Sequence, residues 1–571
     1  MTVQNSKTKH AFPDDVVLVK LLAAAHADTS GKPVIYDANG SEKAYMHLLG
    51  DVLRLRDVMR CQLPSSAFDD QGLLRQDSPY VCVLATSGYE FLVAFFATRV
   101  LGGALISLAS VVLVEETLHF ISDANAICLL QGVGLADKCQ QIKSYVGDKG
   151  RAITTVPIST DANPVNPLDV TLDESLPLDP QGPGFVVYTS GTTGIPKGVV
   201  LSRLTFTTYD LAESGSVTIS FRPTHWLGGA SSLIGPMLTG MKVHVLPEMA
   251  GPELFWETLK RRRITYLSFN PTILRRMKEY YIDVIEHLPD ETRREYLDGL
   301  RHLSRISCSS AMIAPSTLKF WKTLTGLPFE NLYGATEVGA LALRGIDCKV
   351  RNSIGHPIPA VKTKLSDGDR GELLVKNPAM FTHYLNNPEA TRLAFDADGY
   401  VKTGDLMQIV DGEYVFCGRT STDFILFYGC RIPALRVETA LTDLPYISDA
   451  HVLGVPDHEA RELCGAVVRL RKGADQSSGS VSLARIRDDL SGSLPTYMLP
   501  LLLHILGDDE QVPHTVSQKP IKRRMRKMFF GVDDFWSPEL PSPGVEFWDD
   551  FSDQVKGEAR PWDWSGLQRA T

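Results

Sequence analysis

A loop rich in hydroxyl groups and glycine carries the densest chemical signal in the chain. It runs from Thr189 to Gly198, between apolar runs at 185–188 and 199–201 that predict two strands. Glycines let backbone amides approach an anion closely, and hydroxyl side chains add neutral donors. The loop therefore predicts a polyphosphate site, and the residues predicted to bind are Thr189, Ser190, Gly191, Thr192, Thr193, Gly194 and the positively charged Lys197.

The spacing of the loop excludes two other phosphate-binding motifs. A Walker loop would need glycine where Pro196 stands and a hydroxyl where Gly198 stands. A dinucleotide-binding fingerprint is absent because no G-x-G-x-x-G follows the strand at 185–188. A flexible surface loop is the remaining alternative, and the flanking strands favour the phosphate site.

Further motifs follow this loop along the chain. They are Tyr333-Gly-Ala-Thr-Glu337, Tyr400-Val-Lys-Thr-Gly-Asp405 and Gly418-Arg419, with Lys519 beyond them. Together with the loop, they resemble the motifs of the adenylate-forming superfamily, which contains acyl-CoA synthetases, adenylation domains of peptide synthetases and luciferases. The resemblance extends from Lys43 to Phe530, and the order and spacing of its motifs make it specific.

The resemblance implies ATP-dependent activation of a carboxylic acid. A carboxylate resists nucleophiles because its leaving group would be oxide. Attack by the carboxylate on the α-phosphate of ATP expels pyrophosphate and gives an acyl-adenylate with a good leaving group. CoA would then take the acyl group and release AMP. Such chemistry depends on charge neutralisation and in-line positioning, and the implied cofactors are ATP, Mg²⁺ and CoA as co-substrate.

The resemblance also implies roles for single residues. The loop would wrap the β- and γ-phosphates, and Tyr333 would lie against the adenine ring. Thr336 would contact the α-phosphate, and Glu337 would ligate Mg²⁺ through a hard oxygen donor. Asp405 would accept both ribose hydroxyls, and Arg419 would donate to ribose or phosphate.

Lys519 occupies the place of the family's mobile catalytic lysine, which would bridge the carboxylate and the α-phosphate. A plain surface lysine is the alternative, because Gln518 stands where the family has glycine. Leu426 stands where relatives carry lysine, and Arg436 replaces the first acid of a Glu-x-Glu pair that keeps Glu438. These positions serve thioester formation more than adenylation. Transfer to a carrier protein or to an amine therefore stays open, as does a nucleotide-binding homologue without turnover. The predicted catalytic set is Lys519, Thr336, Glu337 and Lys197.

Segment 222–229 resembles the motif that lines the acid pocket. It lacks the aspartate that holds the substrate ammonium in amino-acid-activating relatives, so an α-amino acid is not expected. Gly334 follows the adenine-facing tyrosine where acetate-type relatives carry a bulky residue, which predicts an open pocket floor. These features favour a medium-chain, long-chain or aromatic acid over acetate. A core role is the alternative for Trp226. The predicted pocket residues are His225, Trp226, Gly229, Ser309, Ser310, Ala311 and Gly334.

The elements that must position these residues follow an alternating pattern. Strand-like runs alternate with helical patterns at 91–101 and 252–263, which predicts parallel sheets covered by helices. The strand-like runs lie at 80–84, 185–188, 242–246 and 266–269. From 350 to 415, short strands with Gly/Asp turns predict a barrel-like β subdomain. The expected fold class is α/β, with a large N-terminal domain of two helix-covered sheets plus this subdomain, and a small mobile C-terminal α+β domain.

The expected domains are 1–418, which would bind ATP and the acid, a mobile domain at 419–535, and a Trp-rich tail at 536–571. The tail holds four of the seven tryptophans, at 536, 548, 562 and 564. Either it packs its aromatic side chains over the globular body or it binds a partner. The basic stretch 522–527 is read as the solvated face of a helix, with contact to a CoA phosphate as the alternative.

The composition of the chain limits which classes of protein and partner are expected. With 571 residues, 44% of them hydrophobic, the chain can form more than one domain, and a net charge of -9 argues against nucleic acid as a partner. The nine cysteines have no metal spacing and are read as reduced thiols. The longest uncharged apolar piece, 100–114, is shorter than the ~20 residues of a spanning helix. Neither a secretory signal nor a terminal Ser-Lys-Leu is present, so a cytoplasmic enzyme without a membrane span is expected.

Overall fold

The computed structural model describes residues 10–189, 196–207, 214–248, 250–419, 424–427, 430–458, 460–471, 481–514, 520–532 and 544–548. Within them, a seven-stranded sheet has the order β20-β10-β9-β5-β4-β6-β7. Its inner strands are parallel, while β10 and β20 are antiparallel. The strands are β4 (Tyr80–Leu84), β5 (Ala104–Ser107), β6 (Cys128–Gln131), β7 (Thr154–Pro157), β9 (Pro183–Thr189), β10 (Lys197–Ser202) and β20 (Phe381–Tyr384).

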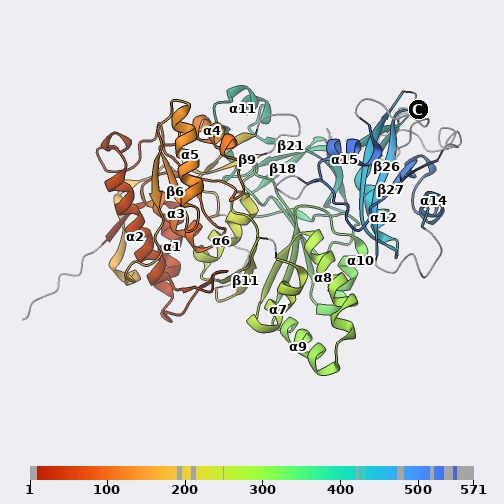
Figure 1. The fold of residues 1–571 in the computed structure, drawn as a ribbon, viewed down its shortest axis with the longest axis horizontal. Coiled ribbons are helices and arrows are strands. Elements are labelled where there is room, and N and C mark those ends of the chain that lie inside the picture. The colour runs from red at the N-terminus through yellow and green to blue at the C-terminus, as the bar shows by residue number, and fades with distance from the viewer. Residues whose placement is uncertain are drawn as a thin grey trace, which may run out of the picture.

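Helices cover both faces of this sheet (Figure 1). Alternate residues of a strand point to opposite faces. Val81 and Val83 of β4 accordingly pack with one helix layer, while Cys82 and Leu84 pack with the other. The first layer contains α1 (Val16–Ala27), α2 (Tyr45–Gln62) and α3 (Tyr89–Val100), and the second contains α4 (Val114–Asp123) and α5 (Ala136–Asp148). Every residue of α3 is buried, because it lies between the sheet and other helices.

A second sheet of nine strands has the order β17-β16-β15-β14-β13-β11-β12-β2-β3 in the described part of the chain. Strands β2 and β11 to β15 are parallel, and the edges are antiparallel. The strands are β2 (Ile35–Tyr36), β3 (Glu42–Lys43), β11 (Val217–Ser220), β12 (Lys242–Val245), β13 (Tyr266–Phe269), β14 (Arg305–Ser309), β15 (Phe329–Tyr333), β16 (Leu343–Ile346) and β17 (His356–Pro357). Its helices are α6 (Leu227–Thr239), α7 (Pro252–Arg262), α8 (Pro271–Asp283), α9 (Asp290–Leu300) and α10 (Pro315–Thr325).

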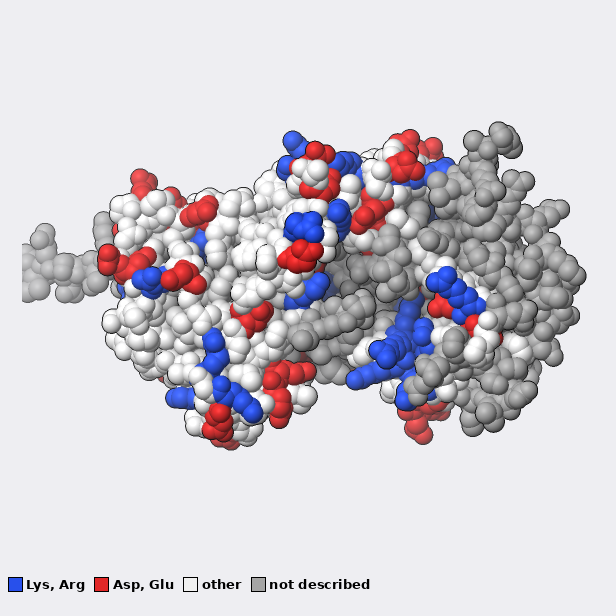
Figure 2. Space-filling model, turned by 90° about the horizontal axis from the view of Figure 1, so that it is seen from above, with Lys and Arg blue, Asp and Glu red and all other residues white. Residues whose placement is uncertain are grey.

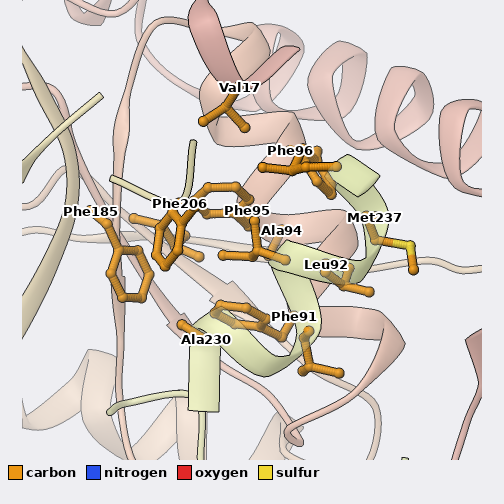
Figure 3. Close-up of a cluster of buried hydrophobic side chains, with 14 of the residues drawn as sticks. Val17, Phe91, Leu92, Ala94, Phe95, Phe96, Phe185, Phe206, Ala230 and Met237 are labelled. Carbon is orange, nitrogen blue, oxygen red and sulfur yellow. The ribbon is translucent and has the colours of Figure 1, made fainter. Parts of the chain in front are cut away.

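The core of the large domain joins the two sheets. Helix α6 packs on α1 and on β11 and β12, so it links one sheet to the other. Figure 3 shows Phe91, Phe95 and Phe96 of α3 beside Phe185 and Phe206, with Met237 of α6 close by. The rings of Phe95 and Phe206 meet edge to face at 5.6 Å. Burial of several such rings stabilises the sheet that carries the predicted phosphate loop.

A buried charge network holds the base of strand β9. The guanidinium of Arg99 donates to both carboxylate oxygens of Asp15, at 2.7 and 2.6 Å, and that of Arg203 lies 3.5 Å from the same carboxylate. A side chain at Gly184 would place its Cβ 2.2 Å from Arg99 Nη1, so the glycine leaves room for the charged group. Asp15 also caps the start of α1.

Two smaller units follow. An antiparallel sheet has the order β18-β19-β21-β22 and forms the β subdomain expected around 350–415. The C-terminal unit has its own hydrophobic core and a sheet that contains β26 and β27. The strands are β18 (Lys362–Asp367), β19 (Arg370–Lys376), β21 (Val401–Val410), β22 (Glu413–Arg419), β23 (Phe424–Phe427), β24 (Cys430–Pro433), β25 (Ile447–Asp457), β26 (Arg461–Leu470) and β27 (Leu502–Ile505). Its helices are α12 (Ala434–Asp443), α14 (Leu483–Ser491) and α15 (Lys522–Phe530), while α11 (Pro388–Ala394) lies before β21.

The two ends of the described chain are both tied into sheets. Strand β1 (His10–Asp14) pairs with β8 (Val170–Pro177), and β28 (Val545–Phe547) pairs with β27. The guanidinium of Arg487 lies over the ring of Trp548, 4.4 Å from its centroid. This part of the predicted tail therefore packs on the globular body. The other tryptophans of the tail lie outside the described residues.

The predicted elements agree closely with those of the structure. Strands β4 and β13 have the expected bounds, and α3 and α7 differ from the predicted helices by one or two residues. The expected α/β architecture is confirmed. Among the described residues, no helix is both long and apolar enough to cross a membrane, and all described cysteines whose side chains are placed are free thiols.

Candidate active site

The predicted phosphate loop is the turn of a β-hairpin. Strands β9 and β10 pair antiparallel, with Thr189 opposite Lys197, so the loop leaves and re-enters the sheet at adjacent positions. Gly198 is buried, and a Cβ there would lie 2.8 Å from Leu385 Cδ1. A larger residue would therefore have to displace the end of the Leu385 side chain, and packing favours glycine at this position. The predicted binding residues Ser190, Gly191, Thr192, Thr193 and Gly194 lie outside the described residues.

Tyr384 joins the phosphate hairpin to the predicted metal ligand. Its strand pairs with β10, so Tyr384 stands opposite Val199. The Nζ of Lys197 lies 5.3 Å from the centroid of the Tyr384 ring. The phenol of Tyr384 donates to Oε1 of Glu337 at 3.1 Å. Burial and the nearby Glu337 carboxylate raise the pKa of Tyr384, so the phenol stays protonated and acts as a donor.

A hydrogen bond between Tyr333 and Asp405 brings the Tyr333 motif and the Asp405 motif together. The phenol of Tyr333, at the end of β15, donates to Oδ2 of Asp405 at 2.5 Å. Asp405 is buried in β21 and is 2% exposed. Arg419 stands opposite Asp405 in the β21–β22 register, although its side chain is not described. This hydrogen bond joins two motifs that lie 72 positions apart in the chain. Both motifs are predicted to contact the bound nucleoside.

The acid pocket is expected where neighbouring parallel strands end. Strands β11, β13, β14 and β15 lie side by side, so their carboxyl ends share one edge of the sheet. Ligands of such sheets bind at that edge. Ser309 ends β14 and is half-buried, while Ser310 and Ala311 are exposed beyond it. Ser310 has a positive φ of 78°, which turns the chain sharply at this point.

His225 and Trp226 lie in the loop between β11 and α6, as expected for the pocket entrance. Their rings meet edge to face at 5.2 Å, and both residues are half-buried. The Nε2 atom of His225 is buried and has no hydrogen-bond partner in the described structure. Burial lowers the pKa of His225 to about 4, so the imidazole is neutral near pH 7.

Two glycines of the predicted pocket are required by the backbone. A Cβ on Gly334 would lie 1.5 Å from the carbonyl oxygen of Ala340, and one on Gly229 would lie 1.9 Å from that of Pro223. No other residue fits at either position without a shift of the main chain. The backbone by itself therefore explains the glycine at 334, and the open pocket floor stays a prediction.

The described residues fit a magnesium site in which the protein supplies one carboxylate and the phosphates of ATP supply further ligands. They contain no group of three or more His, Cys, Asp or Glu side chains that could hold a metal ion. Mg²⁺ is commonly held by one or two carboxylates together with phosphates and water. Glu337 is half-buried, and Tyr384 binds its Oε1. No hydrogen bond is recorded for its other oxygen in the described part of the chain, which leaves that oxygen for a cation.

The predicted catalytic lysine and the positions that depart from the family's pattern lie towards the C-terminal end of the chain. Lys519 and Gln518 lie outside the described residues. The backbone amide of Leu426 donates to Glu462 at 2.8 Å, and Glu438 accepts from the amide of Val452 at 2.8 Å. Arg436 lies on α12. The carboxylates of Glu462 and Glu438 therefore accept hydrogen bonds from backbone amides of the C-terminal unit.

Figure 2 shows Lys and Arg gathered on the half of the molecule that holds the C-terminal unit. Helix α15 contributes exposed Arg523, Arg524 and Lys527. Its other face is buried through Met525, Phe529 and Phe530. This division matches the predicted solvated basic face. Elsewhere on the surface shown, acidic and basic groups are interspersed.

One residue that joins the predicted site residues was missed by sequence reasoning. Tyr384 lies at the end of a short strand with no motif around it. A single tyrosine carries no periodic signal, and only the pairing of distant strands reveals its neighbours.

Comparison with known proteins identifies the family. Residues 59–385 match the model of the AMP-binding enzymes, and residues 436–519 match that of the AMP-binding enzyme C-terminal domain. The acyl-CoA ligase oryP of Aspergillus oryzae is 34% identical, with 94% of this chain and 96% of that protein covered. The mitochondrial malonate–CoA ligase ACSF3 of Bos taurus is 28% identical, with 82% of this chain and 84% of that protein covered.

Solved structures agree on the fold. ATP-bound MatB from Rhodopseudomonas palustris is 23% identical and superposes with a TM-score of 0.71, over 90% of this chain and 98% of that one. The nucleotide motifs, the α/β architecture and the two family matches lead to one conclusion: the chain is an AMP-binding enzyme of the adenylate-forming superfamily.

Proposed function

We propose that the enzyme is an AMP-forming acid–thiol ligase. It activates a carboxylic acid with ATP to give acyl-AMP and pyrophosphate, then transfers the acyl group to CoA and releases AMP. The observation that carries this proposal is the pair of contacts at the nucleotide site. Tyr384 links Lys197 of the phosphate hairpin to Glu337, and Tyr333 links the adenine motif to Asp405. The names of the relatives as CoA ligases support the same reaction.

The residues of the site have distinct tasks in this proposal. Lys197 and the hydroxyl loop neutralise the outer phosphates, so pyrophosphate leaves readily. Thr336 contacts the α-phosphate, and Asp405 binds the ribose. Lys519 bridges the attacking carboxylate and the α-phosphate. Bound Mg²⁺ would add charge neutralisation at the phosphates, and Glu337 would hold it. The domain limits 1–418, 419–535 and 536–571 are part of the proposal, with the hinge after residue 418.

The acid is proposed to be larger than acetate, of the medium-chain, long-chain or aromatic class. The small turn residues Ser309, Ser310 and Ala311 support this size. Several relatives are named malonate–CoA ligases, so malonate is the essential competitor in any test. The acid panel therefore spans acetate, malonate, fatty acids of increasing length and substituted benzoates.

Acid-dependent exchange of pyrophosphate into ATP tests adenylation. The native enzyme is expected to exchange with at least one acid of the panel, and Lys519→Ala is expected to lose most of this activity. Lys349→Ala, outside every proposed site, is the control. Binding of ATP without exchange for any acid would show a nucleotide-binding homologue without turnover, and the proposal would be wrong.

The acceptor is tested by product analysis with and without CoA. Formation of an acyl-CoA with stoichiometric AMP is expected. An acyl amide formed without CoA would favour amine transfer. A product formed only on a phosphopantetheinylated carrier protein would favour carrier transfer, and either result would replace the second step while leaving the first intact.

A further inference from the structure

A short chain of hydrogen bonds joins the two large sheets beside the predicted acid pocket. Thr224 lies in the loop after β11, directly before His225 and Trp226, and is 3% exposed. Its hydroxyl lies 3.0 Å from that of Ser107, and its backbone amide donates to the hydroxyl of Ser87 at 2.9 Å. Both serines belong to the seven-stranded sheet and its loops, whereas β11 belongs to the nine-stranded sheet. Thr224 therefore connects one sheet to the other.

A carboxylate at the end of this chain sets the direction of its hydrogen bonds. The hydroxyl of Ser87 lies 2.5 Å from Oε1 of Glu248, in the loop after β12. An ionised carboxylate only accepts hydrogen bonds, so the single proton of Ser87 points to Glu248. The oxygen of Ser87 then accepts from the amide of Thr224. This arrangement leaves the hydroxyl of Thr224 to share a hydrogen bond with that of Ser107.

The chain of hydrogen bonds lies where neighbouring parallel strands end. Strands β4 and β5 are parallel neighbours in the first sheet, and β11 and β12 are parallel neighbours in the second. The residues at or shortly after the carboxyl ends of these four strands are Ser87, Ser107, Thr224 and Glu248. Ligands of such sheets bind outside the carboxyl ends of the strands. The chain therefore joins the two sheets at the edges where the acid is expected.

The pocket segment has internal contacts that fix the shape of its turn. The backbone amide of Trp226 donates to the carbonyl oxygen of Pro223 at 3.2 Å, and a Cβ on Gly229 would lie 1.9 Å from the same oxygen. Because all three residues belong to the turn, these contacts do not fix its distance from the first sheet. The contacts of Thr224 do. A shift of Thr224 would carry His225 and Trp226 with it, since they follow it in the chain.

We propose that Thr224 is a positioning residue that sets the selectivity of the pocket for its acid. Its hydroxyl would hold His225 and Trp226 at a fixed distance from the first sheet, so it acts through them and needs no contact with the acid. This inference rests on the proposed acid activation and on the predicted pocket. A site distinguishes similar substrates through contacts held in place, and small displacements weaken them.

The experiment measures KM for the acid and for ATP separately in the pyrophosphate exchange assay. Thr224→Val keeps a branched side chain and removes the hydroxyl. KM for the best acid of the panel is expected to rise about 3- to 10-fold, while KM for ATP stays unchanged. The ratio of kcat/KM between the best and the second-best acid should fall, because a displaced turn discriminates less. Thr224→Ser retains the hydroxyl and should restore both values.

Thr265→Val is the matched control. The hydroxyl of Thr265 accepts from the backbone amide of Val217 at 2.8 Å, at the amino end of the same strand β11. This variant loses a comparable hydrogen bond at the edge of the sheet opposite the pocket, so KM for the acid and the selectivity ratio should not change. Thermal denaturation of each variant reports loss of fold. Should Thr224→Val not fold, Ser107→Ala removes the other hydroxyl of the same bond and gives the same test.

A double-mutant cycle tests the bond itself. Thr224→Val and Ser107→Ala should be non-additive in KM for the acid, because each removes the same hydrogen bond. An unchanged KM for the acid in Thr224→Val, or equal changes in Thr224→Val and Thr265→Val, would overturn the inference alone. Exchange by the native enzyme with no acid of the panel would overturn the proposed function as well.

Discussion

The contact between Tyr384 and Glu337 makes a quantitative prediction for adenylation. The phenol donates to Glu337 Oε1 at 3.1 Å, while the ring lies under the Lys197 ammonium. Tyr384→Phe removes the hydrogen bond and keeps the ring. A hydrogen bond to a charged group contributes about 1.5–3 kcal/mol. Glu337 is half-buried and water can replace part of the bond, so we expect a loss of roughly tenfold in kcat/KM, the lower end of that range.

Tyr384→Ala removes the ring as well. The cation–π contact with Lys197 adds about 0.5–1 kcal/mol, so this variant should lose a further two- to fivefold. Because only the ring contacts Lys197, a double-mutant cycle with Lys197→Met should be additive for Tyr384→Phe and non-additive for Tyr384→Ala. Both sets of rates come from acid-dependent pyrophosphate exchange at saturating acid and varied ATP.

The chain offers a matched control for this experiment. Tyr296 also donates to a glutamate, Glu257, and has the ammonium of Lys260 4.7 Å from its ring centroid, but it lies on α9 away from the strand ends. Tyr296→Phe should leave the exchange rate unchanged. If Tyr384→Phe behaves like Tyr296→Phe, Tyr384 does not position Glu337 during catalysis and the reasoning is refuted.

Three further predictions follow from single contacts. Gly334→Ala should unfold the protein or lower its Tm sharply, because the new Cβ would meet Ala340 at 1.5 Å, whereas Gly235→Ala, with nothing within 4 Å, should keep or raise Tm; equal Tm values would contradict this. Asp405→Asn should raise KM for ATP about 10- to 100-fold through loss of a charged acceptor for the ribose, and an unchanged KM in exchange assays would place the ribose elsewhere. Burial lowers the pKa of His244 to about 4; since the unfolded value is near 6.5, this histidine's contribution to stability is complete above pH 6.5 and is lost as pH falls toward 4, by at most about 2 kcal/mol at pH 5. Urea unfolding at pH 7.5 and 5.0 should show a smaller pH dependence for His244→Gln than for the native protein.

The secondary structure and the nucleotide motifs could be predicted from short stretches of sequence. Strand β4 and helix α3 are apolar runs whose length and composition indicate their type without help from the rest of the chain. The loop around Lys197, the Tyr333 and Asp405 motifs and Glu337 are short segments whose residue types and order resemble those of the adenylate-forming superfamily, and their roles in binding phosphate, ribose and Mg²⁺ stay predictions. Because this information is local, it predicted the fold class and the family.

Tertiary structure decided which of these side chains meet and what each glycine means. Tyr384 contacts Glu337 across 47 positions, and Arg222 contacts Ser268 across 46. The nearby backbone requires glycine at 334, a reason that the sequence context, from which an open pocket floor was predicted, did not show. Contacts of this kind depend on strand order and register, which bring distant segments to one edge of a sheet. No local pattern encodes them, and for that reason the sequence predicted the family and its reaction while only the fold showed which of the predicted residues meet.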